Sequence, residues 1–304
     1  MFWLVVKIAR PRTWTFIILA FMIGWSLTGS SFSIKYVIGM VIFVLLVACV
    51  NIINAYTDYD EDRINLPQRV KMVEQIGYKR LPFIVAVLSI FCSILSLAVS
   101  LQFFVIFMIA LFNGLFYSLK PLRFKSNPVL SLVSFSGAVI FPLLGAWVIT
   151  RELLNIPLLF VWLGYSFLVY GTIKNLPDYW GDKEAGLKTS ATVFNTRKKA
   201  ITVATLLLLS PYALLVVFVI LNILEYKFLW LMTLVPFVVL ICYRALTQSD
   251  TKSLEKLHTY GFFYEVGALC LILFLVTNLL YATIIVSITL SVTYVIQKIK
   301  FDSR

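Results

Sequence analysis

The fold of this chain is decided by residues 36–63, YVIGMVIFVLLVACVNIINAYTDYDEDR, in which a long apolar run ends in polar and acidic residues. As a helix, this run can cross the roughly 30 Å hydrocarbon core of a bilayer. Only helices and closed barrels satisfy the backbone inside hydrocarbon, and the run lacks the alternation of a barrel strand. The stretch therefore predicts a transmembrane helix that carries polar side chains to one membrane surface.

The rest of the chain repeats this apolar pattern. The 304 residues are 61% hydrophobic and 13% charged, and the mean hydropathy is +0.95, values that exclude a soluble globular domain. Such a length accommodates about nine spans of roughly 20 residues. We therefore predict an all-α polytopic membrane protein that forms one domain over residues 1–304. The predicted spans are 13–28, 36–56, 82–100, 103–119, 129–149, 157–173, 200–221, 228–246 and 260–280, and a tenth apolar segment, 281–295, leaves nine or ten crossings open.

Lys and Arg are distributed unevenly between the predicted connections. Most of the 26 lie in the N-terminal tail or in alternate connections, as the positive-inside rule requires of cytoplasmic segments. We therefore expect a multi-pass protein of the cell membrane whose N-terminus and active-site loops are cytoplasmic. The net charge of +12 then reflects topology rather than a nucleic-acid partner, because it is not concentrated on a polar domain. The predicted cytoplasmic cap loops are about 58–81, 120–128 and 178–199.

Two aspartate pairs with the same spacing lie on this predicted cytoplasmic side. Asp58 and Asp62 form the first pair, and Asp178 and Asp182 form the second pair 120 residues later. Carboxylates at the end of a membrane helix are expensive and usually functional. The two pairs therefore predict a divalent cation site that holds a phosphorylated ligand.

Asparagines precede the first pair at helical steps. On one helix, Asn51 and Asn54 would share a face with Asp58 and Asp62. All four side chains offer oxygen, and Mg²⁺ prefers carboxylates, waters and phosphate oxygens. The alternative is a hydrated acidic helix end, but both asparagines lie deeper, inside the apolar run.

The second pair has a similar setting. Asn175 precedes Asp178 and Asp182 with the same spacing, although Pro177 and Gly181 disturb a plain helix. A solvated loop between two spans is the alternative interpretation. We predict a second group of oxygen ligands here.

Between the two motifs, a cationic segment follows Tyr117. Lys120, Arg123 and Lys125 supply its positive charges, and Arg offers phosphate a bidentate fork whereas Lys offers a point charge. An ordinary positive-inside loop would also carry such residues. Beside two carboxylate groups we predict a diphosphate clamp, whose candidate residues are Asn51, Asn54, Arg63, Lys120, Arg123, Lys125 and Lys188.

In this order the three motifs resemble those of the UbiA superfamily of intramembrane prenyltransferases, over about residues 11–280. The residues that match the family patterns are Asn54, Asp58 and Asp62, then Tyr117, Ser118, Pro121 and Lys125, then Asp178, Asp182, Gly186 and Thr189. Ala55 and Asn175 stand where the family usually has an acidic or amide residue and an aspartate, which bears on metal number and affinity. The asparagine spacing is most similar to the branch that prenylates dihydroxynaphthoate for menaquinone, a quinone.

The resemblance implies nine helices in a ring around a central cavity that opens sideways to lipid and is capped by the cytoplasmic loops. It also implies Mg²⁺ as the cofactor, an isoprenyl diphosphate donor and a hydrophobic acceptor in the bilayer. The implied metal ligands are Asn54, Asp58, Asp62, Asn175, Asp178 and Asp182. The implied catalytic residues are Asp58, Asp62, Asp178, Asp182 and Tyr117. Tyr117 or Tyr56 would stabilise an allylic carbocation by cation–π attraction.

Several alternatives stay open from the sequence. An ion-coupled transporter would also carry intramembrane carboxylates, whereas a CDP-alcohol phosphotransferase would need a D-G-x-x-A-R start that is absent. Within the resembled family, the acceptor is dihydroxynaphthoate, hydroxybenzoate, haem or a glycerol-phosphate ether lipid. Glu265, inside an apolar segment, is expected to orient the acceptor, to accept a proton or to make a structural contact.

Overall fold

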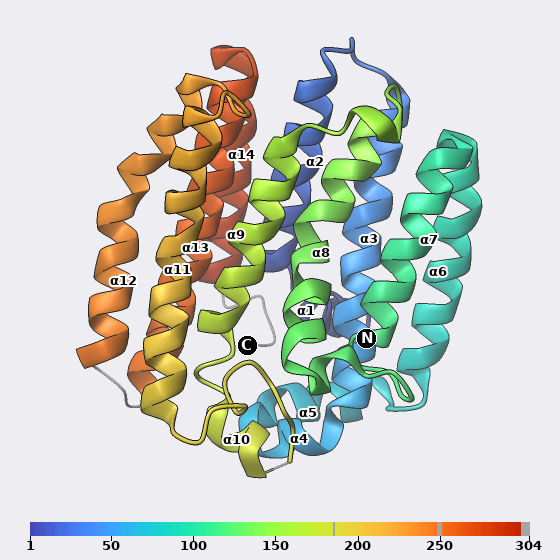
Figure 1. Ribbon diagram of the computed structural model, residues 1–304. Helices are drawn as coiled ribbons and strands as arrows, with labels where there is room; N and C mark the ends of the chain where they lie inside the picture. Colours follow the sequence, from blue (N-terminus) through green and yellow to red (C-terminus); the bar gives the residue numbers. More distant parts are fainter. Residues whose placement is uncertain (185, 248–250, 299–304) are drawn as a thin grey trace. The chain divides into compact units, whose positions relative to one another are not determined.

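The computed structural model describes residues 1–184, 186–247 and 251–298, and this part of the chain contains helices and no strands (Figure 1). The predicted all-α class is therefore confirmed. The long helices are α2 (Trp14–Thr28), α3 (Ile34–Thr57), α6 (Arg80–Val99), α7 (Leu101–Phe116), α8 (Pro128–Trp147), α9 (Leu158–Lys174), α11 (Arg197–Ile220), α12 (Val235–Thr247), α13 (Thr251–Val276) and α14 (Leu279–Lys298). The short ones are α1 (Phe2–Ile8), α4 (Tyr59–Asn65), α5 (Pro67–Ile76), α10 (Tyr179–Glu184) and the 3₁₀ helices η1 (Pro11–Thr13), η2 (Phe124–Ser126), η3 (Leu153–Asn155) and η4 (Tyr226–Leu234).

The apolar helices fit a membrane protein. Among the described residues, 7 helices are long and apolar enough to cross a membrane, with η4 and α12 acting as one, and α7 and α9 are shorter apolar helices. The tenth apolar segment forms its own helix, α14, whose residues Leu279–Ile296 meet the same criterion. A polytopic α-helical membrane protein is thus confirmed, and the count of nine, the ring and the central cavity stay predictions.

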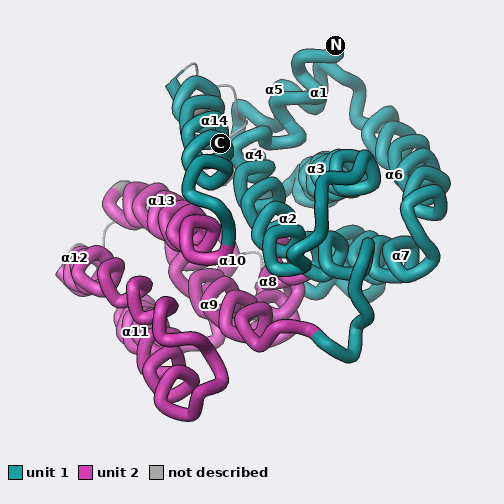
Figure 2. Tube along the Cα trace, turned by 90° about the horizontal axis from the view of Figure 1, so that it is seen from above, with its two compact units in different colours: residues 1–124, 141–155, 277–304 teal, residues 125–140, 156–276 magenta. Residues whose placement is uncertain are grey.

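The chain divides into two compact units, which Figure 2 colours separately. Unit 1 comprises Met1–Phe124, Phe141–Asn155 and Thr277–Arg304, and unit 2 comprises Lys125–Ile140 and Ile156–Val276. The first aspartate motif lies in unit 1 and the second in unit 2. The single domain over residues 1–304 stays a prediction.

In unit 1, α3 packs against α2, α6 and α7. Its motif-bearing end lies beside the short helices α1, α4 and α5 (Figure 1). Ile8 of α1 and Val73 of α5 join Ile52 and Ile53 of α3 in one buried apolar cluster. Burial of such side chains stabilises the folded state by roughly 1.5–3 kcal/mol each. This cluster therefore positions the first motif.

In unit 2, α9 packs against α11 and α13. Pro211 lies inside α11 and cannot donate the usual hydrogen bond to the carbonyl of Leu207. The Ser210 hydroxyl takes that place and donates to the Leu207 oxygen at 2.6 Å. Trp162 of α9 donates to the Pro211 carbonyl at 2.8 Å. The carbonyl groups of Leu207 and Pro211 therefore both accept a side-chain hydrogen bond.

Gly24 lies where α2 passes close to the backbone of α8. A Cβ at this position would lie 2.6 Å from the carbonyl oxygen of Leu143 in α8. Because backbone cannot rotate away, we expect Gly24→Ala to lower the free energy of unfolding by about 1–3 kcal/mol. Thermal unfolding in detergent measures this. Gly267→Ala is the matched control, since nothing lies within 4 Å of its Cβ, and equal stability of both variants would contradict the prediction.

Candidate active site

The first motif is built where α3 ends and α4 begins. Asp58 has φ −99° and ψ 15° and ends α3, its N–H donates to the Asn54 carbonyl at 2.9 Å, and the Asp62 N–H donates to the Asp58 carbonyl at 2.7 Å. The single helix face expected from Asn51 to Asp62 is therefore interrupted at Asp58. The Thr57 hydroxyl lies 3.1 Å from the Ile53 carbonyl oxygen and 2.9 Å from Oδ1 of Asp58, so its single proton is shared between these acceptors. Such local side-chain bonds compete with regular helix.

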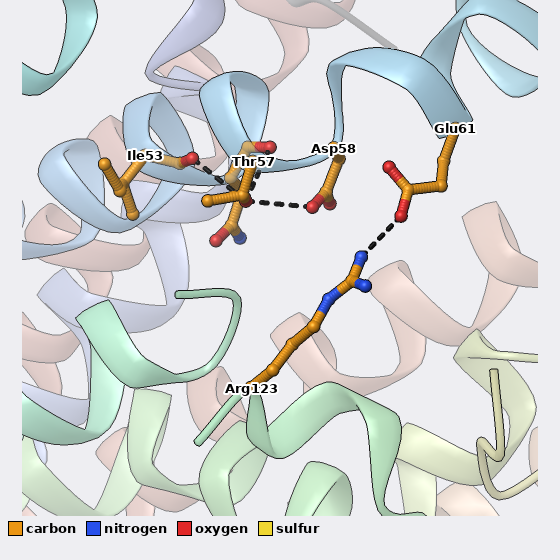
Figure 3. A network of polar contacts seen from close by, with 6 residues as sticks. Ile53, Thr57, Asp58, Glu61 and Arg123 are labelled. Atoms are coloured by element: carbon orange, nitrogen blue, oxygen red, sulfur yellow. Dashed lines mark hydrogen bonds and ion pairs between the residues drawn. The ribbon is translucent and has the colours of Figure 1, made fainter. Parts of the chain in front are cut away.

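Figure 3 shows two polar contacts of this junction. Thr57 donates to Oδ1 of Asp58 at 2.9 Å, which orients that carboxylate. Arg123, from the predicted diphosphate clamp, forms an ion pair with Glu61 of α4. Both side chains of this pair are largely buried, and Arg123 has a left-handed φ of 36°, which is uncommon for a non-glycine residue and frequent at functional sites. Glu61 was not among the predicted site residues, because its sequence neighbours do not reveal its partner.

The two asparagines of the first motif differ in their surroundings. Asn51 is buried and donates to the Ala9 carbonyl at 3.0 Å and to the Thr13 hydroxyl at 3.1 Å, so it ties α3 to the N-terminal segment. Oδ1 of Asn54 is buried without a hydrogen-bond partner, and so is the Ser118 hydroxyl. Buried polar atoms normally have a partner. These two oxygens therefore suit a bound ligand or cation.

Asp62 forms an ion pair with Arg69 of α5, at 3.1 Å. Both side chains are buried, with 4% of Arg69 and 8% of Asp62 exposed. Arg69 was not among the predicted site residues. Pro67 favours the first turn of a helix, so the sequence could have predicted that Arg69 lies near the start of a short helix after the first motif.

The second motif repeats the local geometry of the first. The helix α9 ends at Lys174 with Asn175 as its C-cap, and α10 begins directly after Asp178. The Asp182 N–H donates to the Asp178 carbonyl at 2.9 Å. Both motifs thus read Asp-Tyr-x-x-Asp, with one aspartate just before a short helix and the other one turn into it. The disturbance expected from Pro177 is confirmed, because the long helix stops before it.

Asp182 lies in a mixed electrostatic environment. Burial and the neighbouring Asp178 raise the pKa of Asp182 to about 6, while Lys125, Thr189 and Lys174 act in the opposite direction. Lys125 and Thr189 were expected near the site. Lys174 was not assigned a role, and its ammonium lies 5.0 Å from the centre of the Phe135 ring, a distance suited to a cation–π contact.

The remaining predicted residues are spread over the two units. Asn175 donates from its amide nitrogen to the Ser190 hydroxyl at 2.9 Å. Tyr117 is the C-cap of α7, and Tyr56 stacks on Tyr78 with ring centres 4.4 Å apart. Glu265 is buried inside α13, and its Oε1 has no hydrogen-bond partner. The side chains of Arg63, Lys120 and Lys188 are exposed.

The described residues contain no group of three or more His, Cys, Asp or Glu side chains placed to hold a metal ion. Mg²⁺ commonly binds one or two carboxylates and completes its shell with waters and substrate phosphates. Paired aspartates and the buried Asn54 oxygen fit that mode of binding. Convergence of both motifs on one ligand stays a prediction.

Comparison with known proteins identifies the sequence pattern. The family described as UbiA prenyltransferase family matches residues 14–267. A digeranylgeranylglyceryl phosphate synthase of Methanosphaera stadtmanae is 23% identical over 269 residues, which cover 87% of this chain and 94% of the relative. A chloroplastic 2-acyl-4-prenylphloroglucinol 6-prenyltransferase of Humulus lupulus is 26% identical over 189 residues, 58% of this chain and 45% of the relative.

The fold also matches solved structures. A UbiA homologue from Archaeoglobus fulgidus, bound to DMAPP and Mg²⁺, has a TM-score of 0.65 and 18% identity, and the match covers 87% of this chain and 98% of that one. At this identity the likeness shows the fold.

The raised pKa of Asp182 predicts a pH-dependent stability. A partly buried carboxyl whose folded-state pKa is about 6, against an ordinary 3.8, destabilises the fold when ionised, so this penalty is absent below about pH 4 and full above about pH 6. In EDTA we expect Asp182→Asn to raise the free energy of unfolding by roughly 1–3 kcal/mol at pH 8 and to have little effect near pH 4. Thermal unfolding at both pH values measures this. Glu184→Gln, an exposed acid of the same helix, is the control, and a lower stability of Asp182→Asn at pH 8 would refute the assignment.

The ion pair of Arg123 with Glu61 predicts a gain of affinity. If Arg123 binds diphosphate as predicted, Glu61 would compete for it, so we expect Glu61→Gln to bind pyrophosphate with Mg²⁺ about fivefold more tightly. Arg123→Met should bind it more weakly. Calorimetric titration of the detergent-solubilised protein tests both. Glu74→Gln is the control, because Glu74 accepts a hydrogen bond from Tyr59 instead, and unchanged affinity in Glu61→Gln would exclude the competition.

Proposed function

The chain belongs to the UbiA prenyltransferase family, and on this premise we propose that it transfers an isoprenyl chain from an isoprenyl diphosphate to a hydrophobic acceptor in an Mg²⁺-dependent reaction. The observation that carries the proposal is the matched local geometry of the two aspartate motifs. Each motif follows an apolar helix and has basic side chains in its own unit. The solved homologue with DMAPP and Mg²⁺ supports this choice of ligands. The transporter alternative is set aside because the family is one of prenyltransferases.

The proposed metal ligands are oxygen donors of both motifs. Asp58 is oriented by Thr57, and the partnerless oxygen of Asn54 lies one helical turn earlier. The residues that would hold the metal are Asn54, Asp58, Asp62, Asn175, Asp178 and Asp182. Mg²⁺ bound there would neutralise the charge that grows on the diphosphate as the allylic C–O bond breaks.

Other side chains would bind and shield the reacting group. Arg123, Lys125 and Lys174 offer positive charge for the diphosphate. Tyr117 presents an aromatic ring at the end of α7, where it would stabilise an allylic carbocation. The apolar helices exclude water, which would otherwise capture that cation. The acceptor then attacks the cation and loses a proton.

The acceptor is proposed to be an aromatic quinone precursor or a lipid. An ether-lipid acceptor is the second candidate, because the relative named for digeranylgeranylglyceryl phosphate is covered over 94% of its length, whereas the hop relative, named for a phloroglucinol, is covered over 45%.

The alternating distribution of Lys and Arg further supports a cytoplasmic position for both motifs.

An assay of prenyl transfer in membranes tests this function. Membranes that contain the protein are incubated with labelled geranylgeranyl diphosphate and either dihydroxynaphthoate, hydroxybenzoate or geranylgeranylglyceryl phosphate, with and without Mg²⁺. We expect one labelled prenylated product, released pyrophosphate and dependence on Mg²⁺. Asp58→Ala and Asp182→Ala should lower the rate at least about 100-fold, and Glu225→Ala, in a surface ion pair with Lys227, should not. Full activity of both aspartate variants would refute the site.

A further inference from the structure

Arg69 is buried beside the first motif, and the function proposed above gives it no role. Its Nη1 lies 3.1 Å from Oδ2 of Asp62, and 4% of its side chain is exposed. A buried guanidinium is strongly unfavourable unless an anion pairs with it. Among the described residues, Asp62 supplies the opposite charge beside Arg69.

The backbone that carries Arg69 is held by packing. Val70, Val73 and Ile76 of α5 are buried, and the last two pack in the apolar cluster with α1 and α3. Pro67 starts α5, and the Leu66 N–H donates to the Asp62 carbonyl at 2.8 Å. This tight turn brings α5 back along α4. Arg69 therefore reaches Asp62 from a rigid element rather than from a mobile loop.

The corresponding aspartate of the second motif is held differently. Asp182 occupies the same place as Asp62 in the Asp-Tyr-x-x-Asp pattern. It accepts a hydrogen bond from Thr189 and lies near Lys125 and Lys174. Arg69 acts on Asp62 as a buried opposite charge at 3.1 Å, since Oδ2 of Asp62 accepts no hydrogen bond from the residues that the structure describes. The first motif thus has a buried arginine ion pair, whereas the second motif has a hydroxyl and two lysines.

We propose that Arg69 is a positioning residue that holds the Asp62 carboxylate in the orientation needed to bind the Mg²⁺–diphosphate group, a role that rests on the function proposed above. The ion pair engages Oδ2, and this oxygen accepts no hydrogen bond from the described residues, so it keeps lone pairs with which to bind a cation. Arg69 acts through Asp62 and does not touch the substrate. Groups that orient metal ligands commonly change metal affinity or activity by 10- to 100-fold when they are removed.

A double-mutant cycle on ligand binding tests this role. Arg69→Met, Asp62→Asn and the double variant of the full chain are titrated calorimetrically in detergent with pyrophosphate at saturating Mg²⁺, and then with Mg²⁺ at fixed pyrophosphate. We expect Arg69→Met to weaken binding by about 10- to 100-fold, and the double variant to bind no more weakly than Asp62→Asn alone. Lys71→Met, an exposed cation of the same helix, should bind like the wild type.

The outcomes separate three explanations. Additive losses in the double variant would mean that Arg69 binds the ligand directly, and unchanged binding in Arg69→Met would mean that the pair is only structural; either result overturns the proposal. If Arg69→Met does not fold, the double variant, which leaves no unpaired buried charge, should regain thermal stability. Its binding is then compared with that of Asp62→Asn, and weaker binding overturns the proposal. A wild-type protein that binds no pyrophosphate with Mg²⁺ refutes the proposed function instead.

Discussion

The structure around the site depends on one constraint. An ionised side chain that is buried near the end of an apolar helix needs an opposite charge or hydrogen bonds beside it. An ionised group in a low-dielectric environment is tolerated only with an opposite charge or several hydrogen bonds. Asp62 has Arg69, and Arg123 has Glu61. Asp182 lies near lysines that partly offset its burial. The arrangement of short helices and loops around both motifs follows from supplying these partners.

The similarity of the two motifs has a simple physical basis. A helix that crosses a membrane must stop at the surface, and its last carbonyl groups then need new donors. In both units an aspartate follows the end of the long helix, and a short helix begins directly after it. The second aspartate comes one turn later, so its backbone N–H bonds to the first one. Each unit thereby presents two carboxylates, a number that suits the way Mg²⁺ is usually bound.

Much of the fold could be predicted because hydrocarbon imposes strict rules. Apolar runs of sufficient length identified the helices, including the segment that became α14. For the site, the spacing along the chain was enough to select the aspartates of the two motifs, such as Asp58 and Asp178. The continuous face from Asn51 to Asp62 was wrong, because the helix is interrupted at Asp58. Spacing also gave no indication that Glu61 pairs with Arg123, since the two residues are 62 positions apart.

The sequence by itself determined the all-α membrane class, the positions of the acidic motifs and the resemblance to a prenyltransferase family. Hydrophobicity and short spacings are local properties, so they can be read without a structure. Only the tertiary structure decided the partners of the charged groups, because ion pairs form between elements that packing brings together. Arg69 illustrates this. In the sequence it is one of three arginines in residues 58–81, and its burial against Asp62 appears only once α5 packs beside α1 and α3.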